Sequence, residues 1–217
     1  MPALPRREAA DQTRQHLLEA AFAEFHRNGF RAASIDAILK ATGVTKGALY
    51  YHFRNKAELG YAVVEEIIRP FVEENWKPVC QADNIIDGAI AVLHARMAER
   101  SDIALTLGCP FNNLIQEMSP VDAGFRARLQ AILEDWRQGV AAAIARGQAE
   151  GDIRADVDPQ GTADFIIAGI EGCIGMAKGA QSQTFYQGGM RGLEQYLNNL
   201  RAPARETPLR APARKPL

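Results

Sequence analysis

A short segment, residues 45–53, concentrates side chains that could read the edges of bases in DNA. If the segment is helical, Ala48, Leu49 and Phe53 form an apolar face that rests on the preceding helices. The side chains left exposed are Thr45, Lys46, Gly47, Tyr50, Tyr51 and His52. Hydrogen-bond donors and flat rings on a helix suit an element that enters the major groove. We therefore expect this helix to be the recognition helix of a helix-turn-helix.

Residues around this helix could hold the phosphate backbone of DNA. Lys46 adds positive charge where the helix dipole already favours an anion, and Gly47 lets the backbone approach the sugar-phosphate chain. Ser34 and Lys56 stand at the starts of the preceding and following helices, where both could contact phosphates. The alternative is that the polar residues are plain helix caps and that the aromatic residues only pack. The order and spacing of the whole set favour DNA binding.

The elements that position this segment are all predicted to be helical. The first helix is expected to take Asp11 or Thr13 as its N-cap and to end at Gly29. Ser34 then caps a second helix that ends at Gly43. Further helices are expected over 45–53, 55–78, 83–101, 108–118, 120–151, 160–180 and 184–200. Apolar residues recur at three and four positions and no window alternates with period two, which predicts an all-α fold.

The last two predicted helices are rich in glycine. The glycines are Gly169, Gly172, Gly175 and Gly179 in the first, and Gly188, Gly189 and Gly192 in the second. A glycine inside a helix costs roughly 1 kcal/mol relative to alanine, so their accumulation suggests that another backbone approaches closely. We expect a tightly packed helix pair that forms a dimer face.

Charge is distributed unevenly along a chain whose net charge is -1. Residues 1–60 carry nine Lys and Arg against six Asp and Glu, and residues 61–200 carry eleven against nineteen. Residues 201–217 carry five against one. A basic N-terminal segment followed by an acidic segment suits a protein that contacts a polyanion only through its N-terminal segment, although chance variation could also produce so small a surplus.

The sequence also disfavours several classes of protein. Cys80, Cys109 and Cys173 are scattered, which argues against a disulfide framework or a cysteine metal site and for a reducing cytoplasm. No apolar run approaches the ~20 residues of a membrane span, so a soluble cytoplasmic protein without a membrane partner is expected. Gly-x-Ser-x-Gly, a phosphate-binding glycine loop and metal-spaced histidine pairs are missing, so neither an enzyme nor a cofactor is expected.

Residues 12–60 resemble the tetracycline-repressor (TetR) family of one-component regulators. The match consists of Phe22, Phe25, Gly29, Phe30, Ser34, Ile38 and the runs 43–53 and 55–59. The resemblance implies about nine helices, a homodimer through the helices at about 160–180 and 184–200, and a cavity for a small-molecule effector in each C-terminal domain. It also implies a set of operator-facing positions, which are Ser34, Thr45, Lys46, Tyr50, Tyr51, His52 and Lys56. Leu39 and Lys40 depart from the pattern that is commoner in the second helix of this family, and this departure weakens the resemblance little.

The expected organisation has four parts: a basic flexible arm over 1–10, a helix-turn-helix domain over 11–57, a ligand-binding and dimerisation domain over 58–200, and a disordered Pro/Arg-rich tail over 201–217. The resemblance implies a repressor that a ligand releases from operator DNA. A ligand-dependent activator, or a helical adaptor without operator specificity, is the alternative. Ligand binding would move the fourth helix and so change the separation of the two recognition helices.

The ligand-binding half carries less specific signals. Residues 108–118 resemble a branch of the family with a Gly-Cys motif, in which some members sense electrophiles or small unsaturated acids. A thiol at a helix N-terminus has a lowered pKa, which would suit Cys109 as a sensor, whereas the alternative is a buried small hydrophobe. Candidate ligand-binding residues are Phe71, His94, Cys109, Asn113, Trp136 and Glu171. Helix capping for Asn113, a dimer-seam ion pair for Glu171 and core packing for the aromatic residues are the alternatives.

Overall fold

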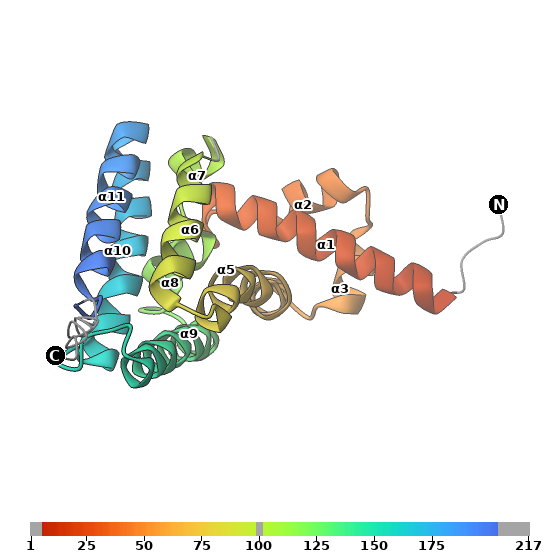
Figure 1. The fold of residues 1–217 in the computed structure, drawn as a ribbon. Coiled ribbons are helices and arrows are strands. Elements are labelled where there is room, and N and C mark those ends of the chain that lie inside the picture. The colour runs from red at the N-terminus through yellow and green to blue at the C-terminus, as the bar shows by residue number, and fades with distance from the viewer. Residues whose placement is uncertain (1–5, 99–101, 204–217) are drawn as a thin grey trace, which may run out of the picture.

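Helices make up the fold of the described residues, which are 6–98 and 102–203 in the computed structural model (Figure 1). Their order is α1 (Arg6–Asn28), α2 (Ile35–Thr42), α3 (Lys46–His52), α4 (Lys56–Val63), η1 (Val64–Ile68), α5 (Arg69–Gln81), α6 (Ile85–Ala98), α7 (Asp102–Leu107), α8 (Pro110–Met118), α9 (Ala123–Glu150), α10 (Pro159–Ala180) and α11 (Gln183–Asn199). Within that part of the chain, the one β-type pairing is an isolated bridge between Ile153 and Arg201. The prediction of an all-α fold is confirmed, and the short α7 is an addition to the helices expected. None of the helices described is long and apolar enough to cross a membrane.

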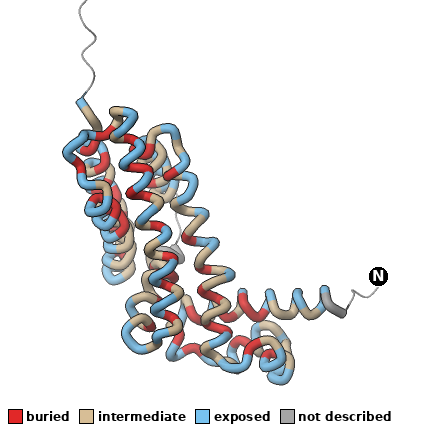
Figure 2. Tube along the Cα trace, turned by 90° about the horizontal axis from the view of Figure 1, so that it is seen from below, coloured by how far each residue is buried: buried red, intermediate tan, exposed pale blue. Residues whose placement is uncertain are grey.

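The first helix begins earlier than the sequence indicated. Because α1 starts at Arg6, neither Asp11 nor Thr13 caps it, and Thr13 Oγ1 instead donates to the Ala9 carbonyl at 2.8 Å inside the helix. Glu8 supplies a carboxylate in the first turn, where the helix dipole favours negative charge. Residues 6–10 of the expected arm are therefore helical, while its residues 1–5 and residues 204–217 of the expected tail lie outside the described chain. Figure 2 shows this end of α1 projecting from the rest of the molecule.

Polar side chains begin the three helices that follow, as the sequence predicted. Ser34, Thr45 and Asn55 each have extended backbone, and each side-chain oxygen accepts from the N–H three residues further on. Such caps satisfy donors that the first helical turn leaves without a partner. Gly43 ends α2 with φ 68°, a left-handed conformation that glycine adopts at little cost. Local sequence therefore fixes the bounds of α2 and α3.

The helix that joins the two halves of the molecule contains a π-helical turn. α4, η1 and α5 run on without interruption. Pro70 lies in the first turn of α5, where it lacks an N–H donor and its ring crowds the carbonyl of Glu66 four residues earlier. The wider turn of η1 precedes this proline and accommodates it within a continuous helix.

The molecule divides into a head, formed by α1, α2 and α3, and a body, formed by the remaining helices. In Figure 1 the head lies at one end, and α10 and α11 stand side by side at the other. Within the body, α9 packs against α5 and α10, while α11 packs against α10 and α6. One apolar core of buried side chains runs from the head through the body.

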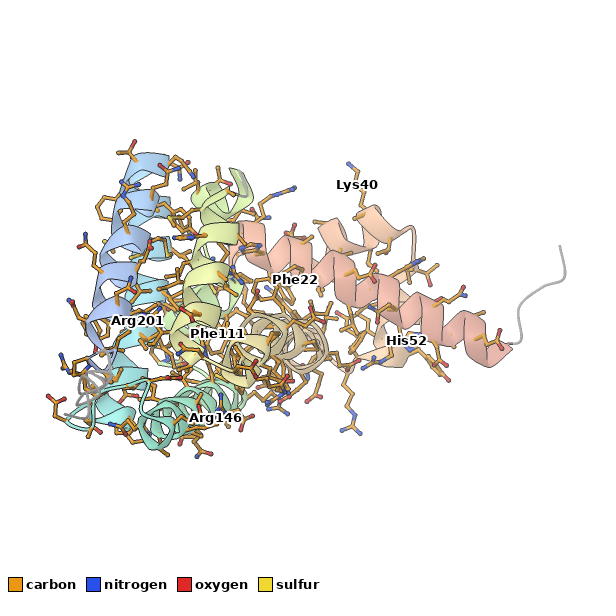
Figure 3. All side chains as sticks on the ribbon, in the orientation of Figure 1. Phe22, Lys40, His52, Phe111, Arg146 and Arg201 are labelled. Atoms are coloured by element: carbon orange, nitrogen blue, oxygen red, sulfur yellow. The ribbon has the colours of Figure 1, made fainter. Side chains whose placement is uncertain are left out.

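Aromatic rings fill the joint between head and body. The fully buried Phe125 of α9 meets the ring of Phe30 at 4.6 Å and the ring of Tyr61 at 5.0 Å between centroids. Gly60 makes room for this cluster, because a Cβ there would lie 2.6 Å from both Phe125 and Phe30. Phe22 also lies where α1 meets the body (Figure 3). The head is thus packed against the body through side chains from α1, α4 and α9.

The glycine-rich helices α10 and α11 leave one face uncovered. Of their glycines, Gly189 has a close neighbour, since a Cβ there would meet the side chain of Cys173. Gly172, Gly175, Gly179, Gly188 and Gly192 have no atom within 4 Å of such a Cβ. Large apolar side chains are exposed on the same two helices, namely Phe165, Met176 and Phe185. An uncovered apolar face of this kind marks an interaction surface.

Candidate nucleic-acid interface and ligand cavity

The outer surface of α3 carries the residues expected to face DNA. Leu49 and Phe53 are buried beneath the helix, whereas Tyr50 is 43% exposed and Tyr51 is 81% exposed. Thr45, Lys46 and Gly47 are also exposed, as is Ser34 at the start of α2. His52 is half-buried, with its ring 5.1 Å from that of Tyr51, and lies toward the outer end of the head (Figure 3). α3 therefore presents aromatic and hydrogen-bonding groups on a rigid support.

The capping hydroxyls of this interface keep a free donor. Ser34 Oγ accepts from Ala37 N–H at 3.4 Å, and Thr45 Oγ1 accepts from Ala48 N–H at 3.2 Å. A hydroxyl that accepts in this way still has its own O–H to donate to a phosphate. Helix capping and DNA contact are therefore compatible roles for both residues.

Lys56 has a role that the sequence did not indicate. Its Nζ donates to the carbonyls of Ala33 at 2.6 Å and Arg31 at 3.2 Å, and it lies 4.9 Å from the centroid of the Phe30 ring. Burial lowers the pKa of this ammonium, while nearby Glu117 and Glu24 raise it. Lys56 thus fixes the connection between α1 and α2, and a phosphate contact can involve only its remaining N–H.

Glu117 of α8 holds the same connection from the body. Its two carboxylate oxygens accept from the backbone N–H groups of Phe30 and Arg31, each at 2.8 Å. Gly29, with φ 77°, lets the carboxylate approach, because a Cβ there would lie 3.1 Å from Oε2. Charge-assisted hydrogen bonds of this kind are stronger than neutral ones. Sequence reasoning missed Glu117, since its partners are 86 and 87 residues away.

A cavity of about 450 Å³ lies in the body among α5, α6, α9, α10, α11 and the start of α8. Its lining is mostly apolar, which is typical of small-molecule sites, and its volume falls in their usual range. Phe71, Cys109, Trp136 and Glu171 of the expected ligand-binding set line it.

Two residues of that set lie outside the cavity lining, which corrects the expectation. His94 Nε2 is 3.0 Å from Glu194 Oε2, so this side chain joins α6 to α11 at the surface. Asn113 donates to the Leu107 carbonyl at 2.7 Å and accepts from Lys178 Nζ at 3.2 Å. Asn113 therefore braces α8 against α7 and α10, which agrees with the structural alternative.

The surroundings of Cys109 oppose the reactive thiolate that its position at a helix N-terminus suggested. Burial, followed by the charge of Glu171, raises the pKa of its thiol to about 12. Backbone hydrogen bonds from Asn112 and Phe111 act in the opposite direction and are outweighed. Because a thiolate is the nucleophile, the raised pKa of this half-buried thiol favours the alternative of an unreactive cysteine.

The polar part of the cavity wall includes residues that sequence reasoning missed. The Arg96 guanidinium donates to Asn75 Oδ1 and acts electrostatically on Glu171, whose carboxylate is hydrogen-bonded to the Cys109 thiol. Glu171 Oε2 and Trp76 Nε1 are buried and have no hydrogen-bond partner within residues 6–98 and 102–203. Sequence reasoning missed Asn75, Trp76 and Arg96, because α5 and α6 bring them beside Glu171 only in the folded chain.

Two residues of the head, Phe22 and His26, reach the cavity. His26 of α1 lines it, and its Nε2 lies 2.9 Å from the Gly108 carbonyl. Burial lowers the pKa of this imidazole, so a neutral ring donates to Gly108. Since Gly108 directly precedes Cys109 and Pro110 of the cavity wall, α1 is bonded to the segment that a ligand would touch.

The burial of the Glu171 carboxylate predicts that the protein becomes less stable as the pH rises. Burial raises its pKa from 4.5 to about 6, so ionisation opposes folding as pH rises through this window; a rise of that size corresponds to about 2 kcal/mol. We expect Glu171→Gln to be more stable than wild type by about 2 kcal/mol at pH 8, with the gain disappearing toward pH 4.5. Urea unfolding across that range measures it.

The same exchange at the exposed Glu74 of α5 controls for the loss of one charge. It should leave the difference from wild type constant across the range. A constant difference for Glu171→Gln as well would contradict the assigned burial of this carboxylate.

Comparisons with known proteins cover both halves of the chain. Residues 17–63 match the model for bacterial regulatory proteins of the tetR family, and residues 88–193 match the tetracyclin repressor-like C-terminal domain. The transcriptional regulator AcuR of Cereibacter sphaeroides is 35% identical over 176 residues, which cover 78% of each chain. The HTH-type transcriptional repressor DhaR of a Mycobacterium species is 30% identical over 174 residues, or 76% of this chain and 82% of that one.

A solved structure agrees with the fold. The crystal structure of a TetR transcriptional regulator from Chloroflexus aurantiacus superposes with a TM-score of 0.80 at 28% identity. The match covers 90% of this chain and 100% of the other.

Proposed function

Because the chain belongs to the TetR family of bacterial transcriptional regulators, we propose that it is a homodimeric repressor that leaves its operator when a small molecule enters the cavity. Its relatives are transcription regulators and not enzymes. We place its action in the cytoplasm, where a regulator meets chromosomal DNA.

The observation that carries this proposal is the bonded connection from the cavity to the DNA-reading head. His26 of α1 donates to Gly108 at the cavity wall, and Glu117 at the other end of α8 accepts from Phe30 and Arg31. A ligand that displaces the start of α8 therefore acts on the C-terminal end of α1 and on the connection that follows it. This route through α8 adds to the one through α4 that the sequence suggested.

The operator contacts that we propose come from α3 and its flanks. They are Ser34, Thr45, Lys46, Gly47, Tyr50, Tyr51, His52 and Lys56. The proposed ligand contacts are Phe71, Cys109, Trp136 and Glu171. Two heads must meet successive major grooves about 34–36 Å apart, so a small change in their separation weakens binding.

The uncovered face of α10 and α11 is the proposed dimer interface. Small residues there let two backbones approach, and exposed Phe165, Met176 and Phe185 supply apolar area. Such an isologous contact would pair each helix with its own copy. Dimerisation doubles every operator contact.

Replacing Tyr51 with alanine tests the operator proposal. A fluorescence-anisotropy titration against the DNA upstream of the protein's own gene should show nanomolar, sequence-selective binding by wild type. Tyr51→Ala should weaken it at least about tenfold, because one base contact contributes about 1–3 kcal/mol and the dimer has two.

Val121→Ala, at an exposed site between α8 and α9, is the matched control and should bind as wild type does. Equal, weak binding to operator and scrambled DNA would instead identify a helical adaptor without operator specificity.

A further inference from the structure

The cavity wall holds two buried polar atoms that have no partner among the described residues. They are Trp76 Nε1, a donor, and Glu171 Oε2, an acceptor when the carboxyl is ionised. Both residues line the cavity. A buried polar group without a hydrogen bond is unfavourable, so natural structures rarely retain one without a reason. A ligand with its own polar atoms would satisfy these groups, whereas a hydrocarbon would leave them unpaired.

The two side chains are held in place by their surroundings. A Cβ at Gly139 of α9 would overlap the six-membered ring of Trp76. The indole can occupy this position only because residue 139 has no side chain. Glu171 is hydrogen-bonded to the Cys109 thiol and lies in the field of Arg96. Neither group needs to be ordered by the ligand, which lowers the entropic cost of binding.

The charges in the wall are balanced before any ligand enters. Among the lining residues that the structure describes, Arg96 carries a positive charge and Glu171 a negative one, and the Arg96 guanidinium already donates to Asn75. A cationic ligand would leave an excess positive charge in an apolar cavity, and an anionic ligand would leave an excess negative one. Buried net charge is strongly unfavourable. A neutral molecule preserves the balance.

We propose that the effector is an uncharged, largely apolar molecule that carries a hydroxyl group, such as a phenol, and that this hydroxyl donates to Glu171 Oε2. An oxygen of the same molecule gives the Trp76 N–H an acceptor. This inference rests on the proposed ligand-sensing function and names the chemical class of its ligand.

Four probes with one ring system separate the alternatives: 2-naphthol, naphthalene, 2-naphthoate and 2-naphthylmethylammonium. Isothermal titration calorimetry with the full chain should give an affinity for 2-naphthol at least tenfold above that for each of the other three. Equal binding of 2-naphthol and naphthalene would overturn the proposal. So would tighter binding of either ion, or no binding of 2-naphthol at 1 mM.

Glu171→Leu should remove the advantage of 2-naphthol over naphthalene while leaving naphthalene bound. Glu74→Leu, at an exposed site on α5, is the matched control and should keep the tenfold ratio. If Glu171→Leu does not fold, Glu171→Gln replaces it. A neutral acceptor is weaker than a carboxylate, so 2-naphthol should then lose at least threefold with naphthalene unchanged. An unchanged ratio in the folded variant would overturn the proposal.

Adding the same probes to the protein–operator complex distinguishes this inference from the proposed function. Binding of 2-naphthol that leaves the complex intact overturns ligand-driven release and leaves the ligand class standing. Operator binding together with equal affinity for naphthol and naphthalene overturns the ligand class and leaves the regulator standing.

Discussion

Phe125→Ala should lower the free energy of unfolding by about 3–5 kcal/mol, the range for removing a large aromatic side chain from a packed core. The ring is fully buried and touches Phe30 of the head and Tyr61 of α4. Gly60, which lies beside the ring, has no side chain that could move into the space. Urea unfolding at constant protein concentration measures the change.

The variant should also bind operator less tightly at temperatures where it is folded, since the ring cluster sets how the head rests on the body. Val121→Ala is the control, because Val121 is exposed between α8 and α9 and should cost less than about 1 kcal/mol. Equal losses of unfolding free energy in the two variants would show that the aromatic cluster does not stabilise the contact between head and body.

The sequence correctly predicted the helix ends that depend on residues close to them in the chain. Ser34, Thr45 and Asn55 begin helices because each can cap the N–H groups just beyond it, and Gly43 ends one because it adopts a left-handed backbone. The start of α1 was missed, since no capping residue stands before Arg6 and the apolar pattern begins only later. The capping signals lie within a single helical turn, so they can be recognised in one sequence without knowledge of the fold.

The chemistry of the site depends on contacts that no local pattern encodes. Cys109 looked reactive from its place before a helix, yet burial beside Glu171 raises its thiol pKa to about 12. Lys56 looked free to meet phosphate, yet its ammonium holds the carbonyls of Ala33 and Arg31. In each case the neighbours that decide the role come from another part of the chain, so they became visible only in the fold.

Gly172→Arg should convert the protein to a monomer and reduce operator affinity at least about a hundredfold. The substitution suits the protomer, because Gly172 is exposed in α10, its Cβ would meet no atom within 4 Å, and arginine favours a helix more than glycine does. At the proposed interface it places an unpaired charge on an apolar face. An uncompensated buried charge costs about 3–5 kcal/mol, and the two-fold axis presents it twice.

Analytical ultracentrifugation and operator titration of the same preparation separate the two effects. Ala131→Arg adds the same charge at an exposed position of α9 and should leave a dimer with wild-type affinity. A monomeric Gly172→Arg with unchanged thermal stability of the protomer would place the dimer contact on α10. A Gly172→Arg protein that remains dimeric would show that this face is not the interface. Two closely packed glycine-rich helices cannot accommodate a long charged side chain between them.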